Sequence, residues 1–188
     1  MHPDLTIVTN QLLAAQAEIH RLAASVDEST WVTRPAPTSW SMSECIGHLA
    51  LTTEAFLPAM RDQLQRPESR ARRAPATLRR SFLAWMLCRA LEPPARQKYP
   101  TTAAFVPDEA MPKAETLAEY DRSQEALLAM IRLGDGVDLT RVELVSPFDS
   151  RLHYSFFSAL HIGAAHARRH IWQANKARER LGARVSAW

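Results

Sequence analysis

The sequence predicts an all-α fold, and three observations support this. Its 188 residues include only five glycines, and 46% of them are hydrophobic against 23% charged, a composition typical of a soluble, largely helical protein. Apolar residues recur at spacings of three and four over several long segments. Most of the twelve prolines lie between residues 34 and 112, so loops are expected there and helices elsewhere. One domain spanning residues 1–188 is the simplest organisation at this length.

Residues 5–26 are expected to form the first long helix. Their apolar positions form a stripe with polar residues between its members: Leu5, Val8, Leu12, Ala15, Ile19, Leu22 and Val26. Such a stripe indicates a helix that packs nearly antiparallel to other helices. The following segment, residues 30–40, contains Pro35 and Pro37 and is expected to be a loop.

The second helix is expected to begin at Ser41 and to run toward Leu64. Ser41 and Glu44 match the S-x-x-E capping box, and Pro58 should interrupt or bend the helix. The predicted core face consists of Met42, Cys45, Ile46, Leu49, Thr53, Phe56 and Met60. His48 falls at the edge of this face, where the small residues Thr52, Ala55 and Ala59 leave room in front of it.

Residues 67–112 form a long connection between the second and third helices. Residues 82–91 are apolar enough for a short buried helix or a lid. Pro93, Pro94 and the residues up to Pro112 predict an extended link. Because so long an irregular link is uncommon in a compact domain, we expect it to cover one mouth of a pocket.

Two further long helices are expected in the C-terminal half. Residues 114–133 repeat the three-four spacing and end at Gly134-Asp135-Gly136, and residues 140–145 alternate as an extended segment would. The last helix should run from residues 152–154 to about residue 182. Four long amphipathic helices favour an up-and-down bundle, although the link lengths equally allow long crossovers.

Charge and cysteine content exclude several classes of protein. The net charge is +3, and its visible source is an arginine run consisting of Arg66, Arg70, Arg72, Arg73, Arg79 and Arg80. No aromatic residues alternate with these arginines, so a solvated loop is favoured over a nucleic-acid patch. Cys45 and Cys88 are expected to be lone buried thiols. Neither a membrane span nor a secretory signal is predicted, so a cytoplasmic location is expected.

A histidine pair near the C-terminus is the strongest chemical signal. His166 and His170 lie four residues apart, so on a helix they share one face and can bind one metal ion if a third ligand joins them. Small residues surround them at Ala159, Gly163 and Ala177. A purely structural core would fill this space with large side chains, which favours a cavity. His161 lies on another face and is not expected to ligate the same ion.

His48 is the candidate third ligand, from the second helix. Three imidazoles would leave coordination positions open for water or substrate, as in a catalytic site, and they suit Zn²⁺, Ni²⁺ or Fe²⁺ equally. An H-x-x-x-H pair also arises by chance, so a structural interpretation stays open. Glu44 could orient His48, although capping is its favoured role. Arg169 could meet an anionic cofactor group or lie on the surface, and Trp172 is expected at an interface or on the surface.

Two segments together resemble the signature helices of the DinB/YfiT-like superfamily. They are Trp40-Ser-Met-Ser-Glu-Cys-Ile-Gly-His48-Leu and His166-Ala-Arg-Arg-His170-Ile-Trp-Gln, and the resemblance covers nearly the whole chain. It implies a four-helix bundle of up-down-down-up order, with the long proline-rich connection between helices 2 and 3, often as a homodimer. It also implies one divalent metal held by His48, His166 and His170, with water at the remaining positions.

The resemblance leads to a metal-dependent enzyme as the first functional hypothesis. The enzyme would be a thiol S-transferase, using a low-molecular-weight thiol such as bacillithiol or mycothiol, or a hydrolase, and would act on a small-molecule substrate. The alternative is a noncatalytic helical bundle that binds a small molecule or a partner, with a structural metal or none. We expect neither nucleic acid nor membrane as a partner, and the arginine run supports a nucleic-acid role only weakly.

Overall fold

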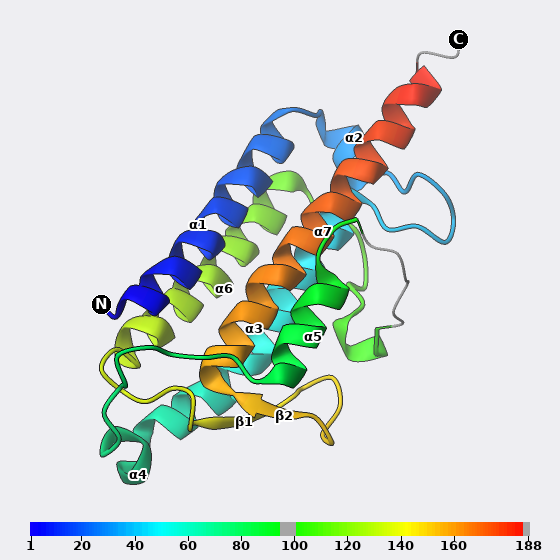
Figure 1. Ribbon diagram of the computed structural model, residues 1–188. Helices are drawn as coiled ribbons and strands as arrows, with labels where there is room; N and C mark the ends of the chain where they lie inside the picture. The colour runs from blue at the N-terminus through cyan, green and yellow to red at the C-terminus, as the bar shows by residue number, and fades with distance from the viewer. Residues whose placement is uncertain (95–100, 186–188) are drawn as a thin grey trace.

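The computed structural model describes residues 1–94 and 101–185. Within these residues the chain forms seven α-helices, one short 3₁₀ turn and one two-stranded antiparallel sheet, so it is mostly helical as predicted. Four of the helices are long (Figure 1): α1 (Pro3–Ala24), α3 (Met42–Gln65), α6 (Lys113–Leu133) and α7 (Phe156–Val185). α3 packs against α6 and α7, and α1 also packs against both.

The first helix, α1, forms where its apolar stripe predicts. Pro3 occupies its first turn, where the missing N–H leaves no hydrogen bond unmade. Every member of the stripe from Leu5 to Leu22 is buried. The short helix α2 (Glu28–Val32) was not predicted, since residues 30–40 were expected to be a loop. The Asp27 carboxylate caps α2 by accepting a hydrogen bond from the Thr30 N–H, and Trp31 is fully buried.

The capping box at the start of α3 is confirmed in both directions. The Ser41 hydroxyl accepts from the Glu44 N–H, and the Glu44 carboxylate accepts from the Ser41 N–H. The helix is not interrupted at Pro58, because this residue faces solvent, where water can hydrate the carbonyl that proline leaves unpaired. His48 is only 2% exposed, so it lies inside the buried face and not at its edge.

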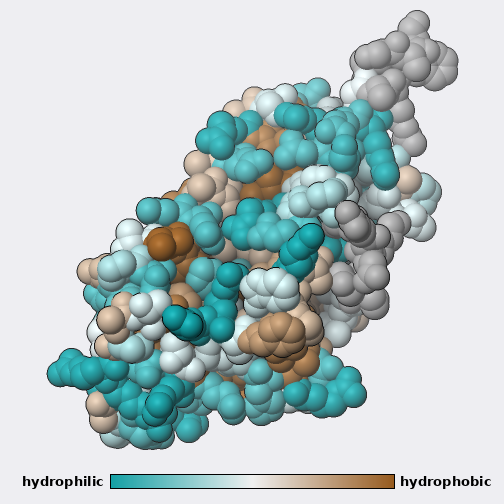
Figure 2. Space-filling model, in the orientation of Figure 1, coloured by the Kyte–Doolittle hydropathy of each residue, from teal (hydrophilic) through white to brown (hydrophobic). Residues whose placement is uncertain are grey.

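The connection between α3 and α6 contains α4 (Pro67–Arg70), α5 (Phe82–Leu91) and the 3₁₀ turn η1 (Ala103–Phe105). The helix predicted at residues 82–91 is present. Of its two predicted roles, that of a buried helix is wrong, whereas that of a lid is supported, because Leu87, Ala90 and Leu91 line the cavity described below. α5 packs on α7 through its small side chains, so Phe82 is 73% and Trp85 50% exposed. Figure 2 shows hydrophobic side chains at the surface over α5.

The arginine run and the two cysteines lie as the sequence predicts. All six arginines of the arginine run are exposed, as predicted for a solvated loop. Cys45 and Cys88 are buried and form no disulfide. Part of the predicted extended link, residues 95–100, lies outside the described residues.

A β-hairpin separates α6 from α7. β1 (Glu143–Val145) pairs with β2 (His153–Ser155), and Leu144 lies opposite Tyr154. The extended segment predicted at residues 140–145 is therefore confirmed in part. The predicted start of the last helix at residues 152–154 is wrong, because residues 153–155 are bound into the hairpin and α7 begins at Phe156.

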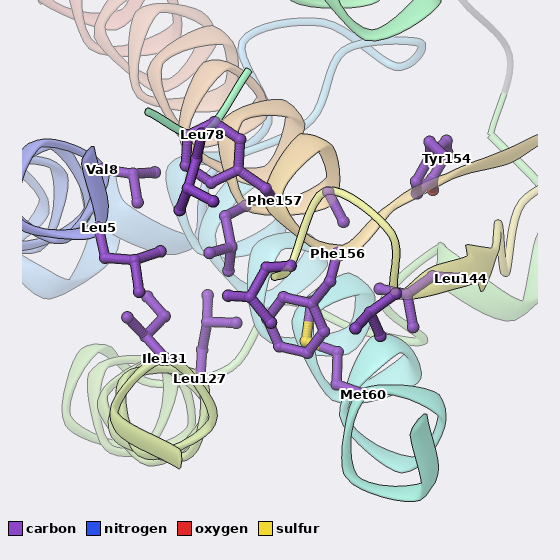
Figure 3. Packing of buried hydrophobic residues seen from close by; sticks show 14 of the residues in the cluster. Leu5, Val8, Met60, Leu78, Leu127, Ile131, Leu144, Tyr154, Phe156 and Phe157 are labelled. Atoms are coloured by element: carbon purple, nitrogen blue, oxygen red, sulfur yellow. The ribbon is translucent and has the colours of Figure 1, made fainter. Parts of the chain in front are cut away.

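The hydrophobic core consists of two clusters that meet partway along α3 and α7. One cluster contains Met60 of α3 and the α7 residues from Phe156 to Ala164. Figure 3 shows its side chains from α1, α3, α6 and α7 converging. The other cluster contains Leu49 and earlier residues of α3, and the α7 residues from Ala167 onward. On α7, His166 lies between the last residue of the first cluster, Ala164, and the first residue of the second, Ala167. On α3, His48 directly precedes Leu49, where the second cluster ends. Among the described helices, none combines the length and apolar character needed to cross a membrane.

Candidate metal centre

Three histidines from α3 and α7 meet at one point. One nitrogen from each of His48, His166 and His170 lies within 4.8 Å of the other two. The Nε2 atoms of His48 and His166 are 3.3 Å apart, and the His170 ring centroid lies 4.5 Å from each of the other two centroids. Within residues 1–94 and 101–185, no other group of histidines, cysteines or carboxylates meets the same distance criterion.

The register between α3 and α7 produces this convergence. His166 and His170 share one face of α7 because they are one helical turn apart. Trp40, just before α3, stacks on His170 with ring centroids 5.8 Å apart, while Phe56, further along α3, approaches Tyr154, just before α7. The two helices therefore run antiparallel, and His48 is carried to the level of the pair.

A backbone carbonyl determines which ring nitrogen of His48 carries the proton. The Nδ1–H of His48 donates to the Phe105 carbonyl at 2.6 Å, which leaves the Nε2 lone pair of His48 facing His166. Phe105 belongs to η1, so the long connection between α3 and α6 orients this side chain. The expectation that this connection covers a pocket is borne out at Thr101 and Thr102, which line the cavity described below.

Burial keeps all three imidazoles neutral. Loss of hydration lowers the pKa of His48, although the hydrogen bond to Phe105 opposes this. Burial, then the neighbouring His48 and the Arg169 guanidinium, lower the pKa of His166 to about 3. Burial and the same kinds of neighbours hold the pKa of His170 well below its ordinary value. Neutral imidazole is the form that binds metals, so the cluster is ready for a cation near pH 7.

The donor atoms fit a divalent transition metal. The Nδ1 atom of His170 is buried and has no hydrogen-bond partner, which is rare for a buried polar atom. A cation bound by the cluster would compensate for the lost hydration of such nitrogens. Three imidazoles without a carboxylate suit zinc, nickel or iron better than magnesium or calcium.

A cavity of about 1060 Å³ adjoins the three histidines. The small residues predicted beside the pair help to form it: Ala159, Gly163 and Ala177 line the cavity, and a Cβ atom at Gly163 would meet nothing within 4 Å. On α3, Thr52 also lines it. The cavity is large enough for a small-molecule ligand of ordinary size.

Four other residues for which the sequence predicts a role or a position lie in this region. Glu44 does not orient His48: its carboxylate binds the Arg34 guanidinium and the Ser41 N–H, as expected of the capping acid. Arg169 is 9% exposed, so the surface interpretation is wrong, and it lines the cavity. Trp172 is partly buried and also lines the cavity. His161 stays outside the cluster, as predicted, and packs edge-on against Phe157.

Three residues of the site were not predicted. Trp40 contacts two of the histidines, Phe105 supplies the carbonyl for His48, and Phe148 lies 6.2 Å from His166 between ring centroids. Trp40 directly precedes the capping box, so its position could have suggested a role. Phe105 and Phe148 lie outside the long helices, where no periodicity indicates which side chains face inward.

A family model described as the DinB superfamily matches residues 11–174 of the chain. The matched range contains all three clustered histidines and both sequence motifs. Comparison with curated proteins and with solved structures gave no match.

Proposed function

The chain belongs to the DinB superfamily, and on this premise we propose that it is a metal-dependent enzyme whose ion is held by His48, His166 and His170. The observation that carries the proposal is the convergence of three neutral imidazoles beside a large cavity. A closed structural site would have four protein ligands, whereas three leave a position for water or substrate.

The residues around the cluster orient the histidine rings and do not occupy the position between them. The Phe105 carbonyl holds the proton of His48 on Nδ1, and Trp40 packs against His48 and His170, which restricts both rings. When bound, a Zn²⁺, Ni²⁺ or Fe²⁺ ion would lower the pKa of a coordinated thiol or water and so supply a nucleophile near neutral pH.

Two reaction classes use such a nucleophile. A thiol S-transferase would take a low-molecular-weight thiol as cofactor, whereas a hydrolase would use water. Addition of thiols to protein reconstituted with Co²⁺ separates them, because thiolate coordination produces a sulfur-to-metal charge-transfer band. A thiol that gives this band and is consumed with an electrophile supports the transferase, and hydrolysis without any thiol supports the hydrolase.

Metal content tests the proposal directly. Protein purified without a metal column, or reconstituted and desalted, should contain about one ion per chain by elemental analysis. His166→Ala should lose it, since two imidazoles rarely hold an ion against dialysis. His161→Ala is the matched control, because it removes a half-buried histidine of the same helix that lies outside the cluster.

The opposite results favour the noncatalytic alternative. Wild-type protein that takes up no metal, or a His166→Ala variant that keeps a full equivalent, would contradict the three-histidine site. Protein that binds metal but shows no turnover with thiols, electrophiles or hydrolysable esters and amides would point to a structural metal in a binding protein.

We also propose that the four long helices form an up-down-down-up bundle and that the chain is a homodimer without nucleic-acid or membrane partners. The mutual packing of α1, α3, α6 and α7 and their directions in Figure 1 support the bundle order. The exposed Phe82, Trp85 and Met86 of α5 support a protein interface. A solution mass of one chain by light scattering would contradict the dimer.

A further inference from the structure

The cavity continues along α7 on both sides of the three histidines. Its lining residues on this helix run from Ala159 to Arg180, which corresponds to about 30 Å of helix rise. Toward the helix C-terminus the lining includes the cationic side chains of Lys176 and Arg180. Toward the N-terminus the lining is apolar, with the rings of Phe56, Phe148 and Tyr154 among aliphatic side chains. The cavity therefore has two chemically different ends with the histidines between them.

The aromatic end is built around Phe148, in the loop of the β-hairpin. Between ring centroids, Phe148 lies 4.7 Å from Phe105, 6.1 Å from Phe56 and 6.2 Å from His166. Phe56 in turn lies 6.2 Å from Tyr154. These are the separations of interacting aromatic rings, so Phe56, Phe148 and Tyr154 form an aromatic part of the cavity lining beside His166, with Phe105 packed behind Phe148.

Four polar side chains at this end, those of Tyr154, Ser146, Asp149 and Thr52, already have partners within the protein. The Tyr154 hydroxyl is hydrogen-bonded to Ser146, whose own oxygen also accepts from the Phe148 N–H. The Asp149 carboxylate is paired with Arg151. The Thr52 hydroxyl donates to the Leu49 carbonyl of its own helix. A charged group placed among these residues would lose hydration without gaining a partner, whereas an uncharged ring would gain apolar contact.

We propose that the Phe148 end of the cavity selects substrates with an uncharged aromatic group, and that Phe148 sets this specificity. The inference rests on the proposed function, because it places the reacting part of the substrate at the three histidines. The substrate class is then an aromatic compound whose reactive atom lies next to its ring. The ring centroids of Phe148 and His166 are 6.2 Å apart, so an aromatic group that contacts Phe148 lies next to a proposed metal ligand.

A series of small metal ligands tests the proposal without any assay of turnover. Imidazole, 4-phenylimidazole and 4-(imidazol-4-yl)benzoate are titrated into Co²⁺-loaded protein, and binding is followed in the visible spectrum of the ion. The phenyl group should strengthen binding at least about tenfold over imidazole, since it buries a whole ring. The added carboxylate should remove most of that gain.

Substitutions test whether Phe148 causes the stronger binding of 4-phenylimidazole. Phe148→Ala and Phe148→Leu should lose most of the phenyl gain, measured in each variant as the ratio of its dissociation constants for imidazole and 4-phenylimidazole. Phe82→Ala is the matched control, because Phe82 is an exposed ring on α5 outside the cavity lining. Circular dichroism melts confirm that each variant is folded, and Phe148→Leu keeps apolar volume in the event that Phe148→Ala unfolds.

The outcomes separate this inference from the proposed function. Protein that binds no Co²⁺ contradicts the metal site. Protein that binds Co²⁺ and imidazole but gains less than twofold from the phenyl group contradicts the aromatic specificity alone, as does a gain that survives in Phe148→Leu. Saturation-transfer NMR of toluene with metal-free protein decides the inference independently: binding by wild type and Phe82→Ala but not by Phe148→Leu supports it, and no binding by the wild type overturns it.

Discussion

His161 and His166 lie on the same helix and both are largely removed from water, yet only His166 joins the cluster. They are five residues apart, so their side chains leave α7 in different directions. His161 packs against Phe157, with the arginines at positions 80 and 168 near enough to affect its ionisation. Sequence spacing was sufficient to separate the two, because helical geometry fixes direction once the helix is known.

The burial of His161 predicts a pH-dependent loss of stability. Burial first, and then the charges of Arg80 and Arg168, lower the pKa of His161 to about 4 from an ordinary value of 6.5. Between these values the unfolded chain binds a proton that the folded chain does not, so stability is complete above pH 6.5 and falls toward pH 4. On lowering the pH from 8 to 5, this residue should cost roughly 2 kcal/mol of unfolding free energy.

His161→Gln should remove that part of the pH dependence. Urea unfolding at pH 8 and pH 5, with a chelator present, gives the loss for wild type and variant. The other six histidines are common to both proteins, so their contributions cancel in the comparison. Equal losses in the two proteins would show that His161 is hydrated and free to take up a proton in the folded state.

The sequence identifies the three histidines but not the groups that surround them. His48, His166 and His170 were identified from residue type, spacing and resemblance, since ligating side chains are chemically distinctive. The Phe105 carbonyl that orients His48 is a backbone atom, which any residue carries, so no residue type could predict it. Phe148 faces the site because of a hairpin loop, where inward and outward positions follow no period.

At the level of elements, capping was the most reliable local signal. The box at Ser41 and Glu44 places the first turn of α3 correctly, and His48 follows from it along the helix. α5 shows the opposite case, because nearly all its residues are apolar and composition could not distinguish its buried from its exposed face. The sequence predicted that the last helix begins where β2 lies. This prediction is wrong because pairing with a strand ten residues earlier overrides the local helical preference.

The capping role of Glu44 predicts that its substitution lowers the stability of the fold but leaves the metal affinity nearly unchanged. Glu44 is 1% exposed and pairs with Arg34, and hydrogen bonds from that residue and Ser41 hold its carboxyl pKa below the usual range despite burial. Glu44→Gln should therefore lower the unfolding free energy by about 1–2 kcal/mol, because Arg34 is half-exposed and can be rehydrated. Metal affinity should change by less than about twofold, because nothing joins this carboxylate to His48.

Denaturant unfolding and a competitive metal titration measure the two quantities. Glu28→Gln is the matched control: its carboxylate accepts from the Lys113 N–H, but it is exposed, so the change should stay within about 0.5 kcal/mol. A tenfold loss of metal affinity in Glu44→Gln, with stability retained, would contradict this prediction and would mean that Glu44 orients His48.

At the scale of the whole molecule, the candidate site occupies the level where the two hydrophobic clusters meet. One cluster ends at Ala164 on α7 and the other begins at Ala167, so imidazoles and a cavity replace hydrocarbon between them. Such a polar gap in a core costs stability unless it is compensated. The amphipathic stripes predicted that helices would pack, but they could not predict a gap between clusters, which depends on the register of α3 against α7.

An ion in this gap should stabilise the whole fold. His48 and His166 are far apart in sequence, and the unfolded chain does not hold them together, so the ion binds the folded state alone. At a free metal concentration about a hundred times the dissociation constant, the gain is about 2.7 kcal/mol. For a chain of this length, that corresponds to a melting temperature raised by roughly 5–10 °C.

Calorimetric melts at pH 7, with and without one equivalent of Zn²⁺, Ni²⁺ or Fe²⁺, measure this shift and rank the three metals. A chelator should reverse it, His48→Ala should abolish it, and His161→Ala should keep it. His48→Ala is the informative variant, because it leaves the H-x-x-x-H pair of α7 intact and removes only the link to α3. A full shift in that variant would mean that the ion binds to one helix and does not connect the two clusters, and the three-histidine centre would then have to be abandoned.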